Sequence, residues 1–342
     1  MVRKAPTLED VAREAGVSRA TVSRVVNGVR NVDPDLREAV RRAIERTGYA
    51  PNSAARALVG RVAGAGAVAL VLSGAGDAFA VRVFADPFFG RVVSGVLGFL
   101  RARGIHPVLL VAESGPARRQ VVDYLRRGAA DGALVVSVRT ADPLPALLDA
   151  AGVPTVLFAR PDELPPRAAC VDLDHAAGAR LAAEHLLARG RRRPGVLAAP
   201  PGLPAARERL RGFREAMARG GVADVPAVEG CFTTESGAAA TAELMRLRPD
   251  TDAVFAANDL MAQGACQYLQ ERGLRVPKDV AVVGFDDSSV AVTCRPALTT
   301  VRQPVERMAA AMAELLTERL REGRTERRTV LFAPELVVRD ST

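Results

Sequence analysis

Two kinds of hydrophobic pattern divide the chain near residue 61. Before this point, apolar residues recur at spacings of three and four, which is typical of amphipathic helices. After it, short continuous apolar runs alternate with helical patterns, as in parallel sheets whose faces are covered by helices. The pattern predicts a small all-helical domain followed by a larger α/β domain.

The N-terminal pattern contains two short helices joined by a tight turn. The apolar spacing predicts a first helix over residues 8–15, with Thr7 as its N-cap and Asp10 completing the first turn. Gly16 supplies the C-terminal stop, and Ser18 is a second N-cap before another apolar stripe. This arrangement predicts a helix-turn-helix.

The start of the second helix carries side chains that suit DNA. In a helix-turn-helix, these residues reach base edges in the major groove, while the first helix crosses the phosphates. Arginine pairs with guanine, serine bonds phosphate oxygens, and alanine contacts a thymine methyl. The residues at these positions are Ser18, Arg19, Ala20, Ser23 and Arg24. The alternative is a helical hairpin in an enzyme, with the arginines on an ordinary solvated face.

A third helix and a short linker complete the N-terminal part. Asp33 and Pro34 form an N-cap and a first-turn proline, and the apolar stripe behind them ends near Gly48. The alanine-rich residues 51–60 have helical propensity, but isolated helices of this length are marginal in water. We therefore expect this segment to be a linker that folds when it docks on a partner.

The net charge of +8 is concentrated at the N-terminus. Residues 1–61 hold 12 Lys and Arg against 7 Asp and Glu, which is +5 of the total. A basic module of this kind is the electrostatic footprint of a polyanion-binding domain. The charge distribution therefore favours the DNA-binding interpretation.

The remaining chain predicts two Rossmann-like lobes. Buried-strand runs lie at 67–72, 107–112, 133–138, 154–159, 169–173, 194–199, 253–258 and 280–285. Helical patterns lie near 88–103, 117–127, 142–151, 174–189, 205–219, 236–247 and 259–272. A final helix at 304–322 and a strand at 328–338 are left for the two lobes to share.

Several function classes find no support in the sequence. A dinucleotide motif beginning at Gly74 is broken because Phe79 stands at the third glycine position, and there is no P-loop or GxSxG. The four Cys and three His residues lack metal-ligand spacing. No apolar leader or membrane-length run is present. We therefore predict a cytoplasmic protein that is not an enzyme and has no cofactor or metal.

Longer stretches give a specific resemblance. TLEDVAREAGVSRATVSRVVNG and the following VDPDLREAVRRAIERTGYAPNSAARAL are very similar to the DNA-binding head of the lactose repressor and galactose repressor family of bacterial transcription regulators. The body resembles the same family in order: DPFFGRVVSGV, RERLRGFREAM, AVFAANDLMAQGA, VAVVGFDDS and LTTVRQPVERM. The resemblance covers nearly the full chain.

This resemblance implies a domain plan. It implies a helix-turn-helix head at 1–50, a hinge helix at 51–60, and a bilobed effector domain at 61–342 like periplasmic sugar-binding proteins. The first lobe takes about 61–160 and 304–324, and the second takes about 161–303 and 325–342. Chain crossings are expected near 159–162, 286–290 and 302–304.

The resemblance also implies partners. It implies a homodimer that binds a palindromic operator and a small effector, expected to be a carbohydrate, with no membrane partner. Further DNA-contacting positions carried over from the family are Thr7, Thr21, Asn27, Asn52, Arg56 and Leu58. Leu58 occupies the position of a leucine that wedges between base pairs and kinks the duplex. The alternative for Leu58 is plain packing against the effector domain.

The family's ligand motifs carry over to Arg209, Asn258 and Asp286. Each lies near the carboxyl end of a strand, where open α/β sheets bind ligands. Phe88 or Phe89 is expected to stack on a sugar face. The alternatives are a turn capped by aspartate for Asp286 and core packing for Phe88.

The chain departs from the family pattern at two places near the expected ligand site. Well-known members have a ligand-bonding aspartate after the fourth strand, whereas this chain has Ala159 followed by Arg160, which favours an anionic or larger ligand. The segment 73–85 is longer than the usual link and is expected to cover the cleft mouth. The sequence thus predicts a ligand-controlled transcription regulator, most simply a repressor, against the alternatives of a periplasmic-type solute-binding protein and a Rossmann-like enzyme.

Overall fold

The computed structural model describes residues 6–26, 32–47, 49, 66–75, 78–136, 139–323 and 325–342. The chain divides into two units, 1–65 and 66–342. The predicted hinge at 51–60 lies outside the described residues. Within the described part, no helix is both long and apolar enough to cross a membrane.

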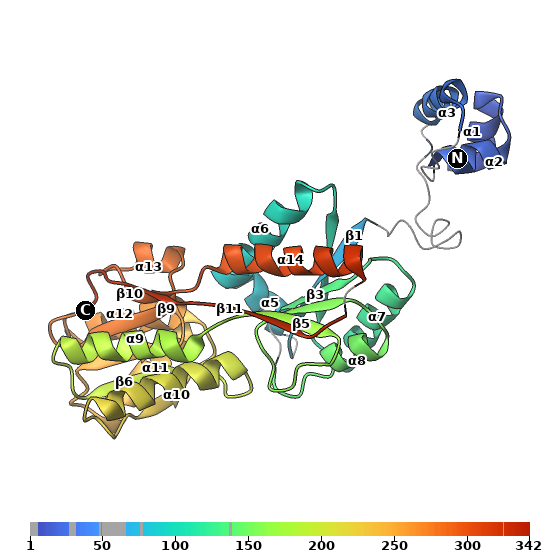
Figure 1. The fold of residues 1–342 in the computed structure, drawn as a ribbon. Coiled ribbons are helices and arrows are strands. Elements are labelled where there is room, and N and C mark those ends of the chain that lie inside the picture. Colours follow the sequence, from blue (N-terminus) through green and yellow to red (C-terminus); the bar gives the residue numbers. More distant parts are fainter. Residues whose placement is uncertain are drawn as a thin grey trace. The chain divides into compact units, whose positions relative to one another are not determined.

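The N-terminal unit is the predicted helix-turn-helix. Its helices are α1 (Leu8–Ala15), α2 (Arg19–Val26) and α3 (Pro34–Thr47), as labelled in Figure 1. Thr7 and Asp10 form the expected capping box, in which the Thr7 amide donates to Asp10 Oδ2 at 2.8 Å. Gly16 ends α1 with a φ of 64°, a left-handed conformation that glycine adopts without strain.

A small apolar core closes this unit. Val11 of α1, Val22 of α2, and Val40 and Ala43 of α3 are fully buried in one cluster. The Ser18 hydroxyl accepts from the Thr21 amide at 3.1 Å, and Asp33 Oδ1 accepts from the Asp35 amide at 2.8 Å. The predicted caps of α2 and α3 are therefore confirmed.

The second unit contains two sheets, each with six described strands. The first sheet comprises β1 (Ala67–Ser73), β2 (His106–Ala112), β3 (Ala133–Val136), β4 (Thr155–Phe158), β5 (Ala168–Leu173) and β11 (Arg328–Phe332). The second comprises β6 (Pro194–Ala198), β7 (Ala227–Glu229), β8 (Ala253–Ala256), β9 (Ala281–Asp286), β10 (Thr299–Arg302) and β12 (Glu335–Val337). The fold class is the predicted one.

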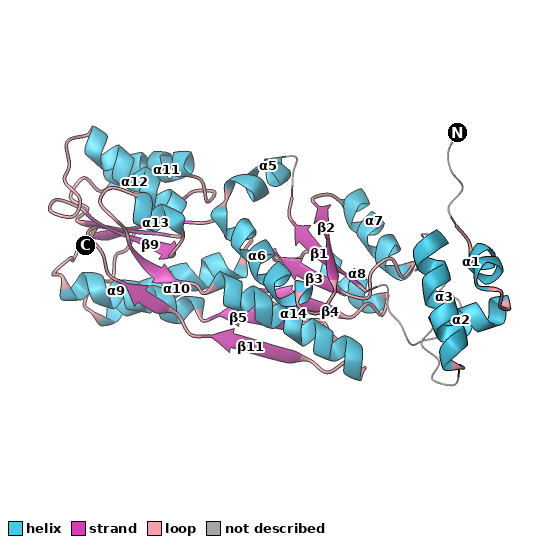
Figure 2. Ribbon diagram, turned by 90° about the horizontal axis from the view of Figure 1, so that it is seen from above, coloured by secondary structure: helices cyan, strands magenta, loops and turns pink. Residues whose placement is uncertain are grey.

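Helices cover both sheets (Figure 2). The first lobe carries α5 (Ala78–Ala85), α6 (Pro87–Arg101), α7 (Gly115–Arg126), α8 (Leu144–Ala150) and α14 (Val305–Glu322). The second carries α9 (His175–Ala188), α10 (Pro204–Arg219), α11 (Thr234–Leu247), α12 (Asp259–Glu271) and α13 (Ser289–Thr293). Of these, α5 and α13 were not expected from the sequence, and neither were strands β7 and β10.

The two sheets have the same strand order. The first reads β2-β1-β3-β4-β5-β11 and the second β7-β6-β8-β9-β10-β12. All paired strands are parallel except the edge pair of β10 and β12. The strand order reverses between β1 and β3 in the first sheet and between β6 and β8 in the second. Open α/β sheets bind ligands outside the carboxyl ends of the strands at such a topological switch point.

The predicted division between the lobes is wrong at two strands. We expected 169–173 and 328–338 in the second lobe, but β5 pairs with β4 and β11 pairs with β5 in the first sheet. The chain therefore crosses between lobes at 174, at 303–304 and at 333–334, of which only the second crossing was expected. A buried apolar run looks the same in either sheet, since long-range pairing decides its place.

The predicted strand over 328–338 is two strands in different sheets. Pro334 stands between β11 and β12, and proline has no amide hydrogen with which to continue a ladder. The chain passes from one sheet to the other at this point.

Candidate effector-binding cavity and DNA-binding head

A cavity of about 400 Å³ lies between the two lobes. Its wall includes residues at or just after the carboxyl ends of strands in both sheets, among them Gly74 after β1, Asp172 of β5, Pro200 after β6 and Asp286 of β9. Each lobe therefore contributes the edge at which an open α/β sheet binds ligands.

The first-lobe wall of the cavity is aromatic. Phe79 of α5, Phe88 and Phe89 of α6, and Phe158 of β4 all line it. Their rings meet edge to face in sequence: Phe79–Phe89 at 6.2 Å, Phe89–Phe88 at 5.2 Å and Phe88–Phe158 at 5.5 Å between centroids. Asp86 caps α6 by accepting from the Phe88 amide at 2.9 Å. Burial raises the pKa of Asp86 above its ordinary value.

The second-lobe wall is centred on Arg209 of α10. This guanidinium is buried, and it lies over the Phe285 ring at 3.7 Å. Its Nη1 donates to the Ala257 carbonyl, and its Nη2 donates to Gln303 Oε1 at 3.3 Å. The same Nη2 lies 3.7 Å from Asp286 Oδ1. Arg209 thus links α10, the last residue of β9 and the residues that follow β8 and β10.

His175 extends this network to the first lobe. Arg209 Nε donates to His175 Nδ1 at 3.3 Å, so the proton of the neutral imidazole is on Nε2. That atom lies 3.3 Å from Asp172 Oδ1 at the end of β5. Burial, together with the Arg209 charge, lowers the pKa of His175, which keeps the ring neutral near pH 7. The first chain crossing therefore lies between two polar residues of the cavity wall.

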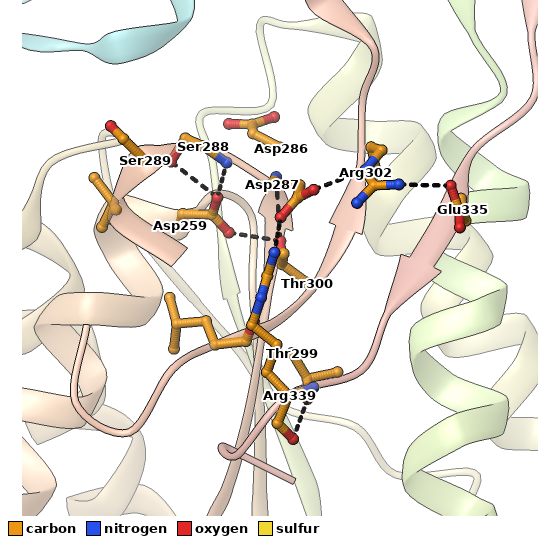
Figure 3. A network of polar contacts seen from close by, with 12 residues as sticks. Asp259, Asp286, Asp287, Ser288, Ser289, Thr299, Thr300, Arg302, Glu335 and Arg339 are labelled. Atoms are coloured by element: carbon orange, nitrogen blue, oxygen red, sulfur yellow. Dashed lines mark hydrogen bonds and ion pairs between the residues drawn. The ribbon is translucent and has the colours of Figure 1, made fainter. Parts of the chain in front are cut away.

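Asp286 is directed into the cavity by an unusual backbone. Its φ is 109° and that of Asp287 is 50°, both in the region that favours glycine. Figure 3 shows the two carboxylates turned in different directions. Asp287 accepts from Arg302 Nε at 2.7 Å and from Arg339 Nη2 at 2.6 Å. These bonds hold Asp287 away from the cavity and leave the carboxylate of Asp286 on its wall.

A second buried carboxylate supports the same turn. Asp259 accepts from the Ser288 amide at 2.7 Å and from the Thr300 hydroxyl at 2.6 Å (Figure 3). Burial raises its pKa to about 6. Asp259 therefore ties the loop after β9 to the neighbouring strand β10 and fixes where Asp286 stands.

Replacement of Asp286 by asparagine is expected to change how stability depends on pH. Burial raises the pKa of Asp286 from 3.8 to about 8, against the opposing charge of Arg209. The folded state thus binds this proton more tightly than the unfolded state, so the stabilisation is full below pH 3.8 and is lost as pH rises through about 8. Melting curves between pH 5 and about 8.5 should show the parent losing stability relative to Asp286→Asn. A constant difference would contradict this assignment.

The structure brings together four of the six predicted effector residues. Phe88, Phe89, Arg209 and Asp286 all line the cavity. Arg160 does not, since it is exposed and lines a neighbouring cavity of about 530 Å³. Ala159 does line the first cavity, where its methyl group supplies no hydrogen bond.

Asn258 is also absent from the cavity wall. It is 2% exposed and caps α12, where its Oδ1 accepts from the Met261 amide at 2.9 Å. Its Nδ2 donates to the Phe232 carbonyl at 3.2 Å. Phe232 does line the cavity, so Asn258 acts there as a positioning residue.

Several wall residues were missed by sequence reasoning. They are Phe79, Asp86, Phe158, Asp172, His175 and Gln303. Asp172 had a usable signal, because it ends a predicted buried strand and carboxyl ends of strands gather at the ligand edge. Phe158 had the same signal, because it lies at the carboxyl end of the predicted strand 154–159. Gln303 lies at the one chain crossing that was expected, whereas Phe79 lies on α5, a helix that was not expected.

Of the seven predicted DNA-contacting residues that the structure describes, the head presents five to solvent. Thr7, Ser18, Arg19, Ala20 and Arg24 are exposed, while Thr21 and Ser23 are half-buried. Arg19 Nη1 lies 3.6 Å from Glu9 Oε1, and this exposed pair contributes about 0–1 kcal/mol at most. Arg19 is therefore easily redirected. Asn27, Asn52, Arg56 and Leu58 lie outside the described residues.

Both parts of the chain match known families. Residues 7–52 match the bacterial regulatory proteins of the lacI family, and residues 183–342 match a periplasmic binding protein-like domain. The chain is 45% identical over 342 residues to the HTH-type transcriptional regulator CelR of Thermobifida fusca, covering 99% of each. It is 32% identical over 341 residues to the repressor PurR of Photobacterium profundum, covering 98% of each.

Solved structures agree with the sequence matches. The transcriptional regulator CelR–cellobiose complex aligns with a TM-score of 0.76 at 43% identity, covering 98% of this chain and 100% of that one. The Lac repressor dimer bound to operator and the anti-inducer ONPF aligns with a TM-score of 0.85 at 28% identity, covering 99% of each.

The fold and the cavity define a regulator with a helix-turn-helix head and a two-lobed ligand-binding unit. Given the full-length similarity to CelR and PurR, this chain belongs to the lacI family of bacterial regulatory proteins, and it is a DNA-binding transcriptional regulator.

Proposed function

We propose that this protein is a repressor whose affinity for a palindromic operator is controlled by cellobiose or a closely related β-linked glucose disaccharide. The observation that carries the proposal is the cavity between the lobes, with an aromatic wall on one side and Arg209 and Asp286 on the other. A solved relative, 43% identical, is a cellobiose complex.

The two walls suit the two surfaces of such a sugar. In β-1,4-linked glucose, the ring substituents are equatorial, so the C–H bonds lie on the flat faces and the hydroxyls at the rim. Aromatic faces carry negative charge density, which attracts C–H groups, so the rings of Phe88 and Phe89 suit the sugar faces. The fork of Arg209 donates to vicinal hydroxyls, and Asp286 accepts from them.

The control of DNA binding requires two lobe arrangements with different ligand affinity. Contacts between the lobes flank the cavity: the Thr140 amide donates to the Gly202 carbonyl at 2.7 Å, and Arg207 pairs with Asp162. Arg91 of α6 donates to the Asp286 carbonyl at 2.9 Å. A sugar held by both walls favours the arrangement in which such contacts are formed.

The proposed DNA-binding surface consists of the predicted residues of the head and hinge. A palindrome needs two heads related by twofold symmetry, so the proposal includes a homodimer that acts in the cytoplasm. The solved Lac repressor relative is a dimer on its operator.

Arg19→Ala is expected to relax base preference at one position in each operator half-site. The loss of one guanine contact costs about 1–3 kcal/mol of discrimination. Binding to a panel of half-site substitutions checks this. Arg13→Ala, which removes the same charge from the exposed face of α1, should weaken every site evenly. Identical discrimination by parent and Arg19→Ala would refute a base-reading role.

Calorimetric titration with disaccharides tests the proposed ligand directly. The purified protein is titrated with cellobiose and with maltose, which differs only in its α linkage. We expect binding of cellobiose at least about tenfold tighter, a difference of about 1.4 kcal/mol. Failure to bind cellobiose, or equal affinity for both sugars, would overturn the proposed ligand.

A further inference from the structure

Helix α5 forms part of the cavity wall. It follows β1 closely and contacts α6. Phe79 and Val83 are 5% and 4% exposed, whereas Phe84 is 77% exposed, so one face of the helix is buried. Only Phe79 of these three lines the cavity. The helix thus presents one aromatic side chain to the ligand site.

The ring of Phe79 rests directly on Gly74. A Cβ added at Gly74 would lie 2.2 Å from Phe79 Cδ2 and 2.3 Å from Cε2, so no side chain fits between strand end and ring. The Gly74 carbonyl accepts from Arg118 Nη2 at 2.7 Å, and Arg118 Nε lies 3.0 Å from Asp142 Oδ1. The Asp142 carboxylate is fully buried, so this ion pair holds Arg118, and through it the backbone of Gly74, in a fixed position.

Phe79 is also the last ring of the aromatic wall. The edge-to-face contacts run from Phe158 through Phe88 and Phe89 to Phe79. The four rings form one continuous apolar surface along which the faces of successive sugar units lie. Where that wall ends therefore decides how many units are accommodated.

We infer that Phe79 sets the length of the bound sugar, closing the site after two glucose units. This inference rests on the proposed function. The cavity of about 400 Å³ is near the lower end of ligand sites, which span about 300–1,000 Å³. A third glucose unit would have to displace the ring of Phe79, and that ring packs directly against Gly74.

The first test compares Phe79→Ala with Val83→Ala. Val83 is buried on the same helix but does not line the cavity, so its replacement controls for loosening of α5. Cellobiose and cellotriose are titrated calorimetrically into each protein. We expect the parent and Val83→Ala to prefer cellobiose by about tenfold or more, and Phe79→Ala to lose that preference.

The second test exploits the contact with Gly74. Gly74→Ala should push the ring of Phe79 into the cavity and weaken cellobiose binding by about tenfold or more. In the Phe79→Ala background, the added methyl group has room, so the same glycine substitution should change affinity by less than about twofold. This double-mutant cycle separates an effect through the ring from a general effect on β1.

The outcomes distinguish the inference from the proposed function. If the parent binds no cellodextrin, the proposed function fails and the inference falls with it. If the parent binds cellobiose but Phe79→Ala keeps the parent's preference over cellotriose, the inference alone fails. It also fails if Gly74→Ala has the same effect with and without the Phe79 ring, or if Val83→Ala abolishes the length preference as Phe79→Ala does.

Discussion

Replacement of Arg209 by methionine is expected to give a protein that binds operator normally but no longer responds to cellobiose. Methionine keeps an apolar stem over Phe285 and removes the guanidinium that contacts Gln303 and Asp286. A hydrogen bond from a charged group contributes about 1.5–3 kcal/mol. Loss of the two hydrogen bonds proposed from the Arg209 guanidinium to vicinal sugar hydroxyls should therefore weaken sugar binding about 100-fold or more. If the sugar is an inducer, the variant represses permanently.

Arg211→Met is the matched control. Arg211 is on the same helix, but its guanidinium is half exposed and pairs with Glu208 and Glu215 at the surface. Its replacement should leave sugar affinity and the sugar-dependent change in operator affinity at parent values. Fluorescence anisotropy of labelled operator, with and without cellobiose, measures the response. If Arg209→Met kept the parent's cellobiose-dependent change in operator affinity, Arg209 would have no part in the control of operator binding.

Replacement of Val22 by aspartate is expected to abolish operator binding and leave sugar binding intact. Val22 is fully buried between the three helices of the head. An unpaired buried charge costs several kcal/mol, and a domain of this size has little stability to lose. Operator affinity should fall to the nonspecific level, typically about 10³-fold or more below specific binding.

The control for this variant is Val338→Asp in the second unit. Val338 is half exposed, so the same exchange should leave both activities unchanged. Limited proteolysis provides the structural readout, because an unfolded head is digested while residues 66–342 resist. Calorimetry with cellobiose then shows whether the second unit is intact. Loss of sugar binding in Val22→Asp would contradict independent folding of the two units.

The sequence predicted the head almost completely because its structure is local. The box formed by Thr7 and Asp10, the left-handed Gly16 and the cap at Ser18 each act within a few residues. Caps and apolar spacing therefore carry enough information to place α1, α2 and α3. The strands β7 and β10 were missed because neither is a continuous apolar run: β7 has only three residues and ends in Glu229, and Val301 is the one apolar residue of β10.

The lobe assignment failed because parallel pairing is long-range. Leu173 and Phe332 are neighbours in register although 159 residues of sequence separate them, and no local pattern encodes that partnership. The position of Pro334 was the available signal for the last crossing. It marks the place where a continuous strand cannot persist.

The cavity was predicted in part. Arg209 and Asp286 were placed by family motifs and lie together as expected, while Asn258 has both ends of its amide engaged by the backbone. His175 was not predicted as a wall residue, because it follows the first chain crossing between the lobes. That crossing lies at 174 and was expected near 159–162. Phe79 belongs to the segment 73–85, which was predicted to cover the cleft mouth but was not predicted to contain a helix.

The coupling between sugar and operator is the central claim, and one pair of titrations measures it most directly. Operator affinity is determined with and without saturating cellobiose, and cellobiose affinity with and without saturating operator. Thermodynamic linkage requires the same factor in both experiments, typically about 5–150-fold. We predict equal factors in this range. Tight binding of cellobiose that leaves operator affinity unchanged would contradict the account.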